Sequence, residues 1–72
     1  MVNINKLRGR IIENGLNVET LAGLIGIDRA TLYRRLNDGG ETFLIKEVSE
    51  ISRVLNLSND DINAIFFAQP VA

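Results

Sequence analysis

Residues 17–37 decide the fold of this chain, and they read NVETLAGLIGIDRATLYRRLN. Asn17 and Asp28 each precede a run with helical apolar spacing, at the place where a short polar side chain caps a helix. Gly26, between the two runs, permits a backbone with a positive φ and so lets the first helix end. The pattern predicts two short helices joined by a tight turn, a helix-turn-helix over about residues 17–37.

The apolar residues of this stretch indicate how the two helices meet. Leu21, Ala22 and Ile25 give the first helix one apolar face. Leu32 and Leu36 are i,i+4 partners on the second helix. Ala22 stands where the helices cross, and its small side chain lets them approach at the steep angle that the motif requires. A larger residue there would wedge the two helices apart.

The sides of the second helix that the leucines leave free are basic and polar. They hold Arg29, Ala30, Thr31, Tyr33, Arg34 and Arg35. Three cations and an aromatic hydroxyl on a solvent face suit the major groove of DNA. The alternative is an αα-hairpin inside a helical bundle, with the arginines on an ordinary solvated face. The capped turn, the small crossing residue and the basic helix occur together and in order, which favours the DNA-binding motif.

Length and composition set the class of protein. The chain has 72 residues, so we expect one domain over residues 1–72. It has no cysteine and no histidine, which excludes disulfides, thiolate zinc sites and histidine-based catalysis, and we expect no cofactor. No apolar run approaches the ~20 residues that cross a bilayer, and the N-terminus lacks a signal-peptide layout. The expected location is the cytoplasm, without membrane contact.

The charge is unevenly distributed along the chain, although its net value is only −1. Residues 1–36 hold six basic and three acidic side chains, a net charge of +3, whereas residues 37–72 hold two basic and six acidic ones, a net charge of −4. Phosphate binding is therefore expected only in the N-terminal half. The acidic half either faces solvent or meets a basic partner.

Apolar spacing outside residues 17–37 predicts three further helices and no strand, so the architecture is all-α with five helices. The first helix starts near Asn3 or Asn5 and ends at about Asn14. Its expected core stripe is Ile4, Leu7 and Ile11. Its solvated cations are Lys6, Arg8 and Arg10, one of which could reach a phosphate.

The fourth helix is expected at about residues 45–55, after a loop at residues 37–42 and a core residue, Phe43. Its buried face is predicted to hold Ile45, Val48, Ile51 and Leu55, and its outer face Lys46, Glu47, Glu50 and Arg53. The fifth helix begins with a capping box of Ser58 and Asp61 and stops at Pro70.

The end of the last helix raises a question about partners. Ile65 and Phe66 can face inward, but Phe67 lies about 100° around the helix from Phe66. A domain this small has difficulty burying both rings together with Val71. If Phe67 is exposed, the last helix, with Ile65, Phe66 and Phe67, is expected to be a contact surface for a second protein chain.

The order of these motifs resembles that of the lambda-repressor-like, XRE-type DNA-binding domains, the Cro and CI class of phage regulators, over nearly the whole chain. The likeness is strongest to small Cro-like proteins of temperate phages of Gram-positive bacteria. The segments that carry it are residues 26–37, Phe43, Glu47-Val48, Leu55-Asn56-Leu57 and Ile65-Phe66-Phe67. The chain is also similar to the modulator-of-repression proteins of such phages, which share the fold but bind the phage repressor.

The resemblance implies roles for particular residues. The recognition helix is residues 29–36, and its first residues, Arg29, Ala30 and Thr31, meet base edges. Further along the groove lie Tyr33 and Arg34, with Asn37 on a phosphate and Asn17 at the capped start of the preceding helix. Two positions depart from the family pattern: Val18 stands where glutamine is common, and Leu44 replaces a polar cap.

Two functions follow from these features. The first is a sequence-specific transcriptional regulator that binds a two-fold related operator as a homodimer. The second is an antirepressor that binds the phage repressor, which the acidic C-terminal half, Val18 and Phe67 favour. An enzyme is not expected, because helix capping explains Asp60 and Asp61 and nothing pairs a nucleophile with a base.

Overall fold

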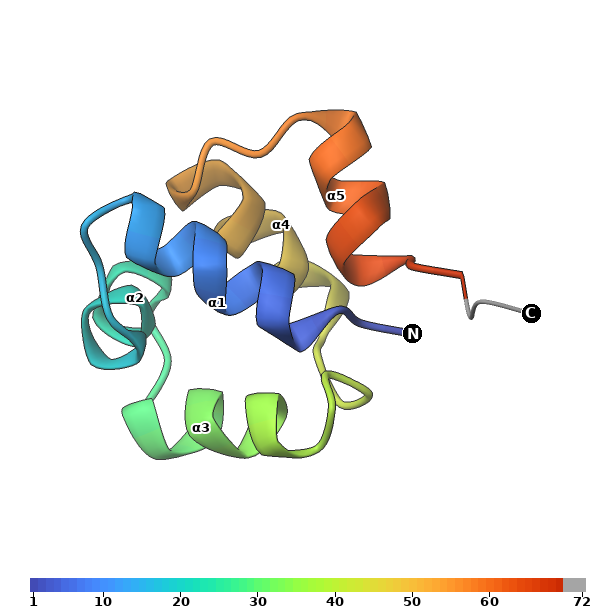
Figure 1. The fold of residues 1–72 in the computed structure, drawn as a ribbon. Coiled ribbons are helices and arrows are strands. Elements are labelled where there is room, and N and C mark those ends of the chain that lie inside the picture. Colours follow the sequence, from blue (N-terminus) through green and yellow to red (C-terminus); the bar gives the residue numbers. More distant parts are fainter. Residues whose placement is uncertain (70–72) are drawn as a thin grey trace.

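The structure is a computed structural model and describes residues 1–69. This part of the chain contains five helices. They are α1 (Ile4–Glu13), α2 (Val18–Ile25), α3 (Arg29–Asn37), α4 (Ile45–Val54) and α5 (Asn59–Phe66) (Figure 1). No strand occurs between residues 1 and 69, so the predicted all-α architecture is confirmed. The last helix ends at Phe66, earlier than the expected stop at Pro70, so that bound is wrong. Pro70 itself and Val71, expected to compete for the core, lie outside the described residues.

Polar side chains start three of the helices, as the sequence predicts. The Asn3 carboxamide oxygen accepts from the Lys6 N–H at 3.1 Å, and that of Asn17 accepts from the Thr20 N–H at 2.8 Å. Ser58 and Asp61 form the expected capping box. Asp28 occupies the N-cap position of α3 with an extended backbone, but its side chain makes no capping hydrogen bond, so that part of the prediction is wrong.

The turn between α2 and α3 has the geometry that the sequence requires. Gly26 has φ 77°, in the left-handed region that glycine enters without steric cost. The Ile27 N–H then donates to the Ala22 carbonyl at 3.0 Å and closes the end of α2. Ala22 is fully buried, as expected for the residue at the crossing of the two helices.

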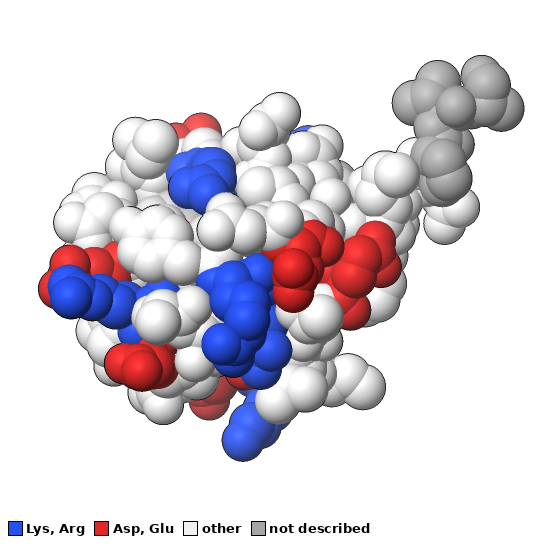
Figure 2. Space-filling view, turned by 90° about the horizontal axis from the view of Figure 1, so that it is seen from below, with Lys and Arg blue, Asp and Glu red and all other residues white. Residues whose placement is uncertain are grey.

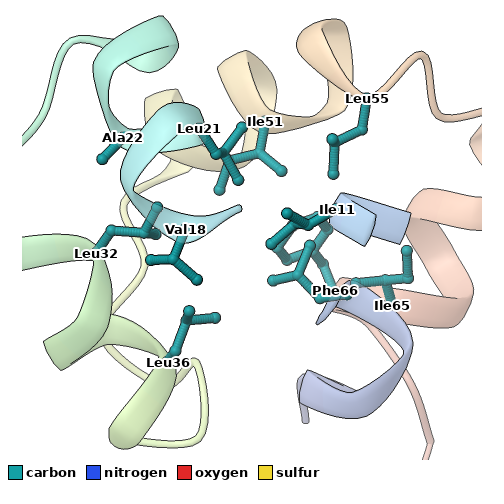
Figure 3. Packing of buried hydrophobic residues seen from close by; sticks show 11 residues of the cluster. Ile11, Val18, Leu21, Ala22, Leu32, Leu36, Ile51, Leu55, Ile65 and Phe66 are labelled. Atoms are coloured by element: carbon teal, nitrogen blue, oxygen red, sulfur yellow. The ribbon is translucent and has the colours of Figure 1, made fainter. Parts of the chain in front are cut away.

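The core lies where all five helices converge (Figure 3). Its buried residues are Leu7, Ile11, Val18, Leu21, Ala22, Leu32, Leu36, Ile51, Leu55, Ile65 and Phe66. Phe43, before α4, packs edge-on against Phe66, with ring centroids 5.9 Å apart and an interplanar angle of 88°. α2 packs against both α3 and α4, so the helix-turn-helix is held from behind by the fourth helix.

Helix α4 is rotated relative to the sequence-based prediction. Ile45, expected in the core, is 90% exposed, and Glu47, expected outside, is only 5% exposed. The cause is an interaction between helices: both Glu47 carboxylate oxygens accept hydrogen bonds, so the buried charge has partners. Val48 is partly buried and Ile51 and Leu55 are fully buried, as predicted.

The last helix also needs a correction. Ile65 and Phe66 were expected to form part of a protein contact surface together with Phe67, but both are buried in the core. They cannot reach a partner while the domain stays folded. Phe67, just after α5, is 60% exposed, so it is the residue of the three that a partner can contact.

Candidate nucleic-acid interface

Helix α3 turns one face into the core and the opposite face to solvent. Leu32 and Leu36 are buried, which directs the other side of the helix outward along the lower edge of the molecule (Figure 1). The exposed side chains are Arg29, Ala30, Tyr33, Arg34 and Asn37, and Thr31 is half-buried. These residues are the ones that the resemblance places in a DNA groove, and the structure brings them onto one surface, called the α3 face below. Figure 2 looks onto that side of the molecule.

The arginines of α3 differ in what they contact. Arg29 lies 3.3 Å from the Glu19 carboxylate of α2, and both side chains are largely exposed. Such surface pairs contribute about 0–1 kcal/mol and are screened by salt, so DNA can compete for the guanidinium. The Arg34 side chain makes no ion pair or hydrogen bond with any of residues 1–69, which leaves its charge available for a ligand.

Arg35 has a different role from the one that the sequence predicts. Its Nε and Nη2 donate to the two Glu47 carboxylate oxygens at 3.0 and 3.2 Å. The α3 face therefore presents two cations, because the third, Arg35, is turned back onto α4. The hydrogen bond to Glu47 raises the pKa of Arg35, which stays protonated.

Glu47 joins three parts of the chain through one carboxylate. Besides Arg35, its Oε1 accepts the Leu44 N–H at 3.0 Å, so Glu47 supplies the cap of α4 that Leu44 lacks. Burial raises the pKa of Glu47, but the hydrogen bonds from Arg35 and from the Leu44 N–H outweigh burial and hold that pKa below its usual value. The ionised pair fixes the C-terminal half of α3 against α4. A glutamate three residues into a helix after an uncapped start was the sequence signal for this role.

The cations of α1 differ in what they contact. Arg10 pairs with Asp61 of α5 at 2.8 Å and with Glu13 at 3.2 Å, so it links the first and last helices. Hydrogen bonds from the Ser58 N–H and hydroxyl lower the pKa of Asp61. Burial opposes them with a smaller effect, and the nearby Arg10 charge lowers the pKa further. The expectation that Arg10 is an ordinary solvated cation is therefore wrong. Lys6 is exposed and Arg8 is half-buried.

The start of α2 adds polar groups beside the α3 face. Asn17 accepts both the N–H and the hydroxyl of Thr20, at 2.8 and 2.7 Å, which fixes the side chain in place. The Val18 side chain is buried and apolar, so it donates no hydrogen bond to a phosphate. Asp38 and Glu41 are exposed after α3, and acidic side chains flank the basic ones on this side of the molecule (Figure 2).

A second surface, apolar in character, lies away from the α3 face. Ile45 and Phe67 border a shallow hollow whose walls include Val2, Phe43 and Val48. We call Ile45, Phe67 and this hollow the apolar surface. Among residues 1–69, the structure contains no cluster of three or more potential metal-ligating side chains and no helix that is long and apolar enough to span a membrane.

A capped helix-turn-helix with an exposed, basic and polar second helix defines the class of helix-turn-helix DNA-binding proteins. Comparison with protein families agrees, because the model of the Cro/C1-type HTH DNA-binding domain matches residues 6–67. The chain belongs to this lambda-repressor-like, XRE-type family and is a DNA-binding transcriptional regulator. Comparisons with curated proteins and with solved structures found no match.

Proposed function

We propose that this chain is a Cro-like regulator that binds a specific operator in the lysis/lysogeny switch of a temperate phage, in the host bacterial cytoplasm. The observation that carries the proposal is the α3 face, where the residues expected to contact DNA are exposed together. The Arg35–Glu47 pair supports the helix from behind. A recognition helix held in one orientation can place its side chains against base edges with little loss of entropy on binding.

Residues on the α3 face divide between base reading and backbone contacts. Arg29, Ala30 and Thr31 begin the helix and meet base edges, where the planar guanidinium of Arg29 can bond O6 and N7 of guanine together. Tyr33 and Arg34 follow the groove wall. Asn37 and Asn17 contact phosphates on either side, which fixes the register without reading sequence.

A single α3 reads too few base pairs for high specificity, so the proposal includes a homodimer. Phe67 on the apolar surface is the expected contact between two copies. The two recognition helices must then lie about 34 Å apart to enter successive major grooves on one side of the duplex. The operator is accordingly expected to have two-fold related half-sites.

Selection from a library of duplexes with a randomised segment of about 20 base pairs, two half-sites long, tests this function. The expected result is one enriched, two-fold symmetric sequence that the chain binds at least about 10³-fold more tightly than random DNA. Equal binding to all sequences, or no binding at physiological salt, would contradict the proposal. Replacing Arg34 with glutamine should weaken binding, with no change in the thermal melt.

A second function, an antirepressor that binds the phage CI-type repressor, is favoured by the apolar surface. Ile45 and Phe67 are exposed although both are apolar, and two of the three arginines of α3 are in ion pairs. Titrating the chain against operator DNA, alone and with the cognate repressor, separates the two functions. An antirepressor releases or alters the repressor–operator complex without binding that DNA itself, whereas a Cro-like regulator shifts the DNA on its own.

A further inference from the structure

A hollow beside the α3 face is lined by side chains from α1, from the start of α2 and from α3. Its polar lining residues are Arg8 of α1, Asn17 at the N-cap of α2, and Tyr33 of α3. The remaining walls are apolar, and no acidic residue lines the hollow. A site with one cation and no carboxylate attracts anions.

Each of the three polar side chains has a donor that the described part of the protein leaves without an acceptor. The Arg8 side chain makes no ion pair or hydrogen bond with residues 1–69, in contrast to that of Arg10, which is bound to Asp61 and Glu13. The carboxamide oxygen of Asn17 is occupied by two bonds from Thr20, so its NH₂ group is the end that remains. The Tyr33 hydroxyl likewise has no hydrogen-bond partner within residues 1–69, and its side chain is partly exposed.

We propose that Arg8, Asn17 and Tyr33 together form a binding site for a backbone phosphate of DNA. A guanidinium, an amide NH₂ and a phenol hydroxyl are all donors, and a phosphodiester is an anion with acceptor oxygens only. Tyr33 belongs to both the hollow and the α3 face. The phosphate in this site therefore belongs to the same duplex whose bases α3 reads.

The proposal rests on the proposed DNA binding and extends the interface to the first helix. It assigns Arg8 as the cation of α1 that contacts DNA, because Arg10 is held by two carboxylates and Lys6 does not line the hollow. Held on three helices, the phosphate fixes the position of the duplex relative to α3. Arg8 is thus a positioning residue and carries no sequence information.

The test measures DNA affinity of Arg8→Gln over a range of salt concentrations, on a mixed-sequence duplex and on the duplex selected by the wild type. Lys6→Gln is the matched control, since it removes the same charge from the same helix outside the hollow. Arg8→Gln should lower the affinity for both duplexes by about tenfold. The slope of log K against log salt should fall by about 0.9, the value for one phosphate contact. The thermal melt should not change, because the Arg8 side chain has no polar partner within residues 1–69.

Several outcomes would overturn the inference. A loss of affinity in Arg8→Gln no larger than that in Lys6→Gln would show that Arg8 does not bind a phosphate. A loss confined to the selected duplex would show that Arg8 reads a base. Tyr33→Phe, which removes the hydroxyl alone, should weaken binding to both duplexes roughly two- to fivefold. No loss in that variant would remove Tyr33 from the site.

The source of the phosphate is tested separately by amide NMR shifts at constant ionic strength, with sodium phosphate in one titration and the mixed-sequence duplex in the other. A DNA site predicts shifts at Arg8 and Asn17 with the duplex and none with millimolar inorganic phosphate. Saturation by free phosphate would assign the site to a small anion and overturn the DNA assignment. If the wild type binds no duplex at all, the proposed function fails, and this inference fails with it. If the wild type binds DNA and the Arg8 and Tyr33 variants bind it equally well, this inference fails and the proposed function stands.

Discussion

The α3 face and the apolar surface expose side chains for different physical reasons. On the α3 face, arginines, an asparagine and a tyrosine are stable in water and keep their charge or hydrogen-bonding groups ready for a polar ligand. On the apolar surface, Ile45 and Phe67 contact water at a free-energy cost of ~25 cal/mol for each Å² of apolar area until something covers them. The first surface should bind in a salt-dependent way and the second should not.

A difference in depth accompanies this difference in chemistry. Behind the α3 face, Leu32 and Leu36 enter the core, so the outward residues can be changed without touching the packing. Beneath the apolar surface lies Phe66, one residue from Phe67 and almost fully buried. Substitutions at Phe66 and Phe67 should therefore have very different effects on the stability of the domain. Four variants test the difference between the two surfaces.

Phe66→Ala should have the largest effect. It removes a buried ring that packs edge-on against Phe43, and truncating a buried phenylalanine costs about 3–5 kcal/mol. That is most of the stability expected for a domain of this size. Thermal melts followed by circular dichroism should show a variant that is largely unfolded at 37 °C. A melting temperature close to that of the wild type would mean that Phe66 is not a core residue.

Phe67→Ala should leave the fold nearly unchanged, because the ring is 60% exposed. If the apolar surface is an interface, the substitution should weaken self-association or repressor binding by about 2 kcal/mol or more, as aromatic hot spots do. Sedimentation across a concentration series measures this loss. An equal loss of stability in Phe66→Ala and Phe67→Ala, with association unaffected, would show that the apolar surface is not a protein–protein interface.

Glu47→Gln should destabilise the domain by about 1–3 kcal/mol, since it leaves the half-buried Arg35 without its charged partner. The pKa of Glu47 is lower in the folded state than in the unfolded chain, so its stabilising effect is present above the unfolded value, about 4.3, and is lost as the pH falls through the folded value. The gap in unfolding free energy between wild type and variant should narrow on acidification. Glu50→Gln, at an exposed ion pair on the same helix, is the control and should change little. A gap that stays constant with pH would contradict the role of the ionised carboxylate.

Arg29→Ala should have the smallest effect, about 1 kcal/mol of discrimination between the selected operator and random DNA. The loss is at the low end of the range for a base contact because Arg29 must give up Glu19 to reach a base. The melt should not move. Equal losses on both duplexes in a mobility-shift series would show that Arg29 contacts phosphate instead of a base.

The parts of the molecule that the sequence predicts are those that depend on local spacing. The turn at Gly26, the cap at Asn17 and the buried pair Leu32 and Leu36 follow from residues within a few positions of one another. The family resemblance then predicts which side of α3 is expected to meet DNA.

The parts that the sequence misses depend on residues far apart in the chain. Arg10 and Asp61 are separated by 51 positions, and Arg35 and Glu47 by 12, so no periodicity within one helix indicates that they pair. Glu47 is buried where Arg35 and the Leu44 N–H bind its carboxylate, whereas Ile45, two residues earlier in α4, is 90% exposed. Of the three residues expected at a protein interface, Ile65 and Phe66 lie in the core, as their spacing on an inward face of the helix allowed, and Phe67 is exposed.

The position of the Glu47 carboxylate has a consequence for how such a protein can change over evolutionary time. The carboxylate holds α3 through Arg35, on the side of the helix away from the expected DNA, and it leaves residues 29–31 and 33–34 outside the interaction. Mutation can then alter the residues expected to read bases while the helix keeps its orientation. Single substitutions can then change which operator sequence is preferred, and no variant along the way has to lose its fold.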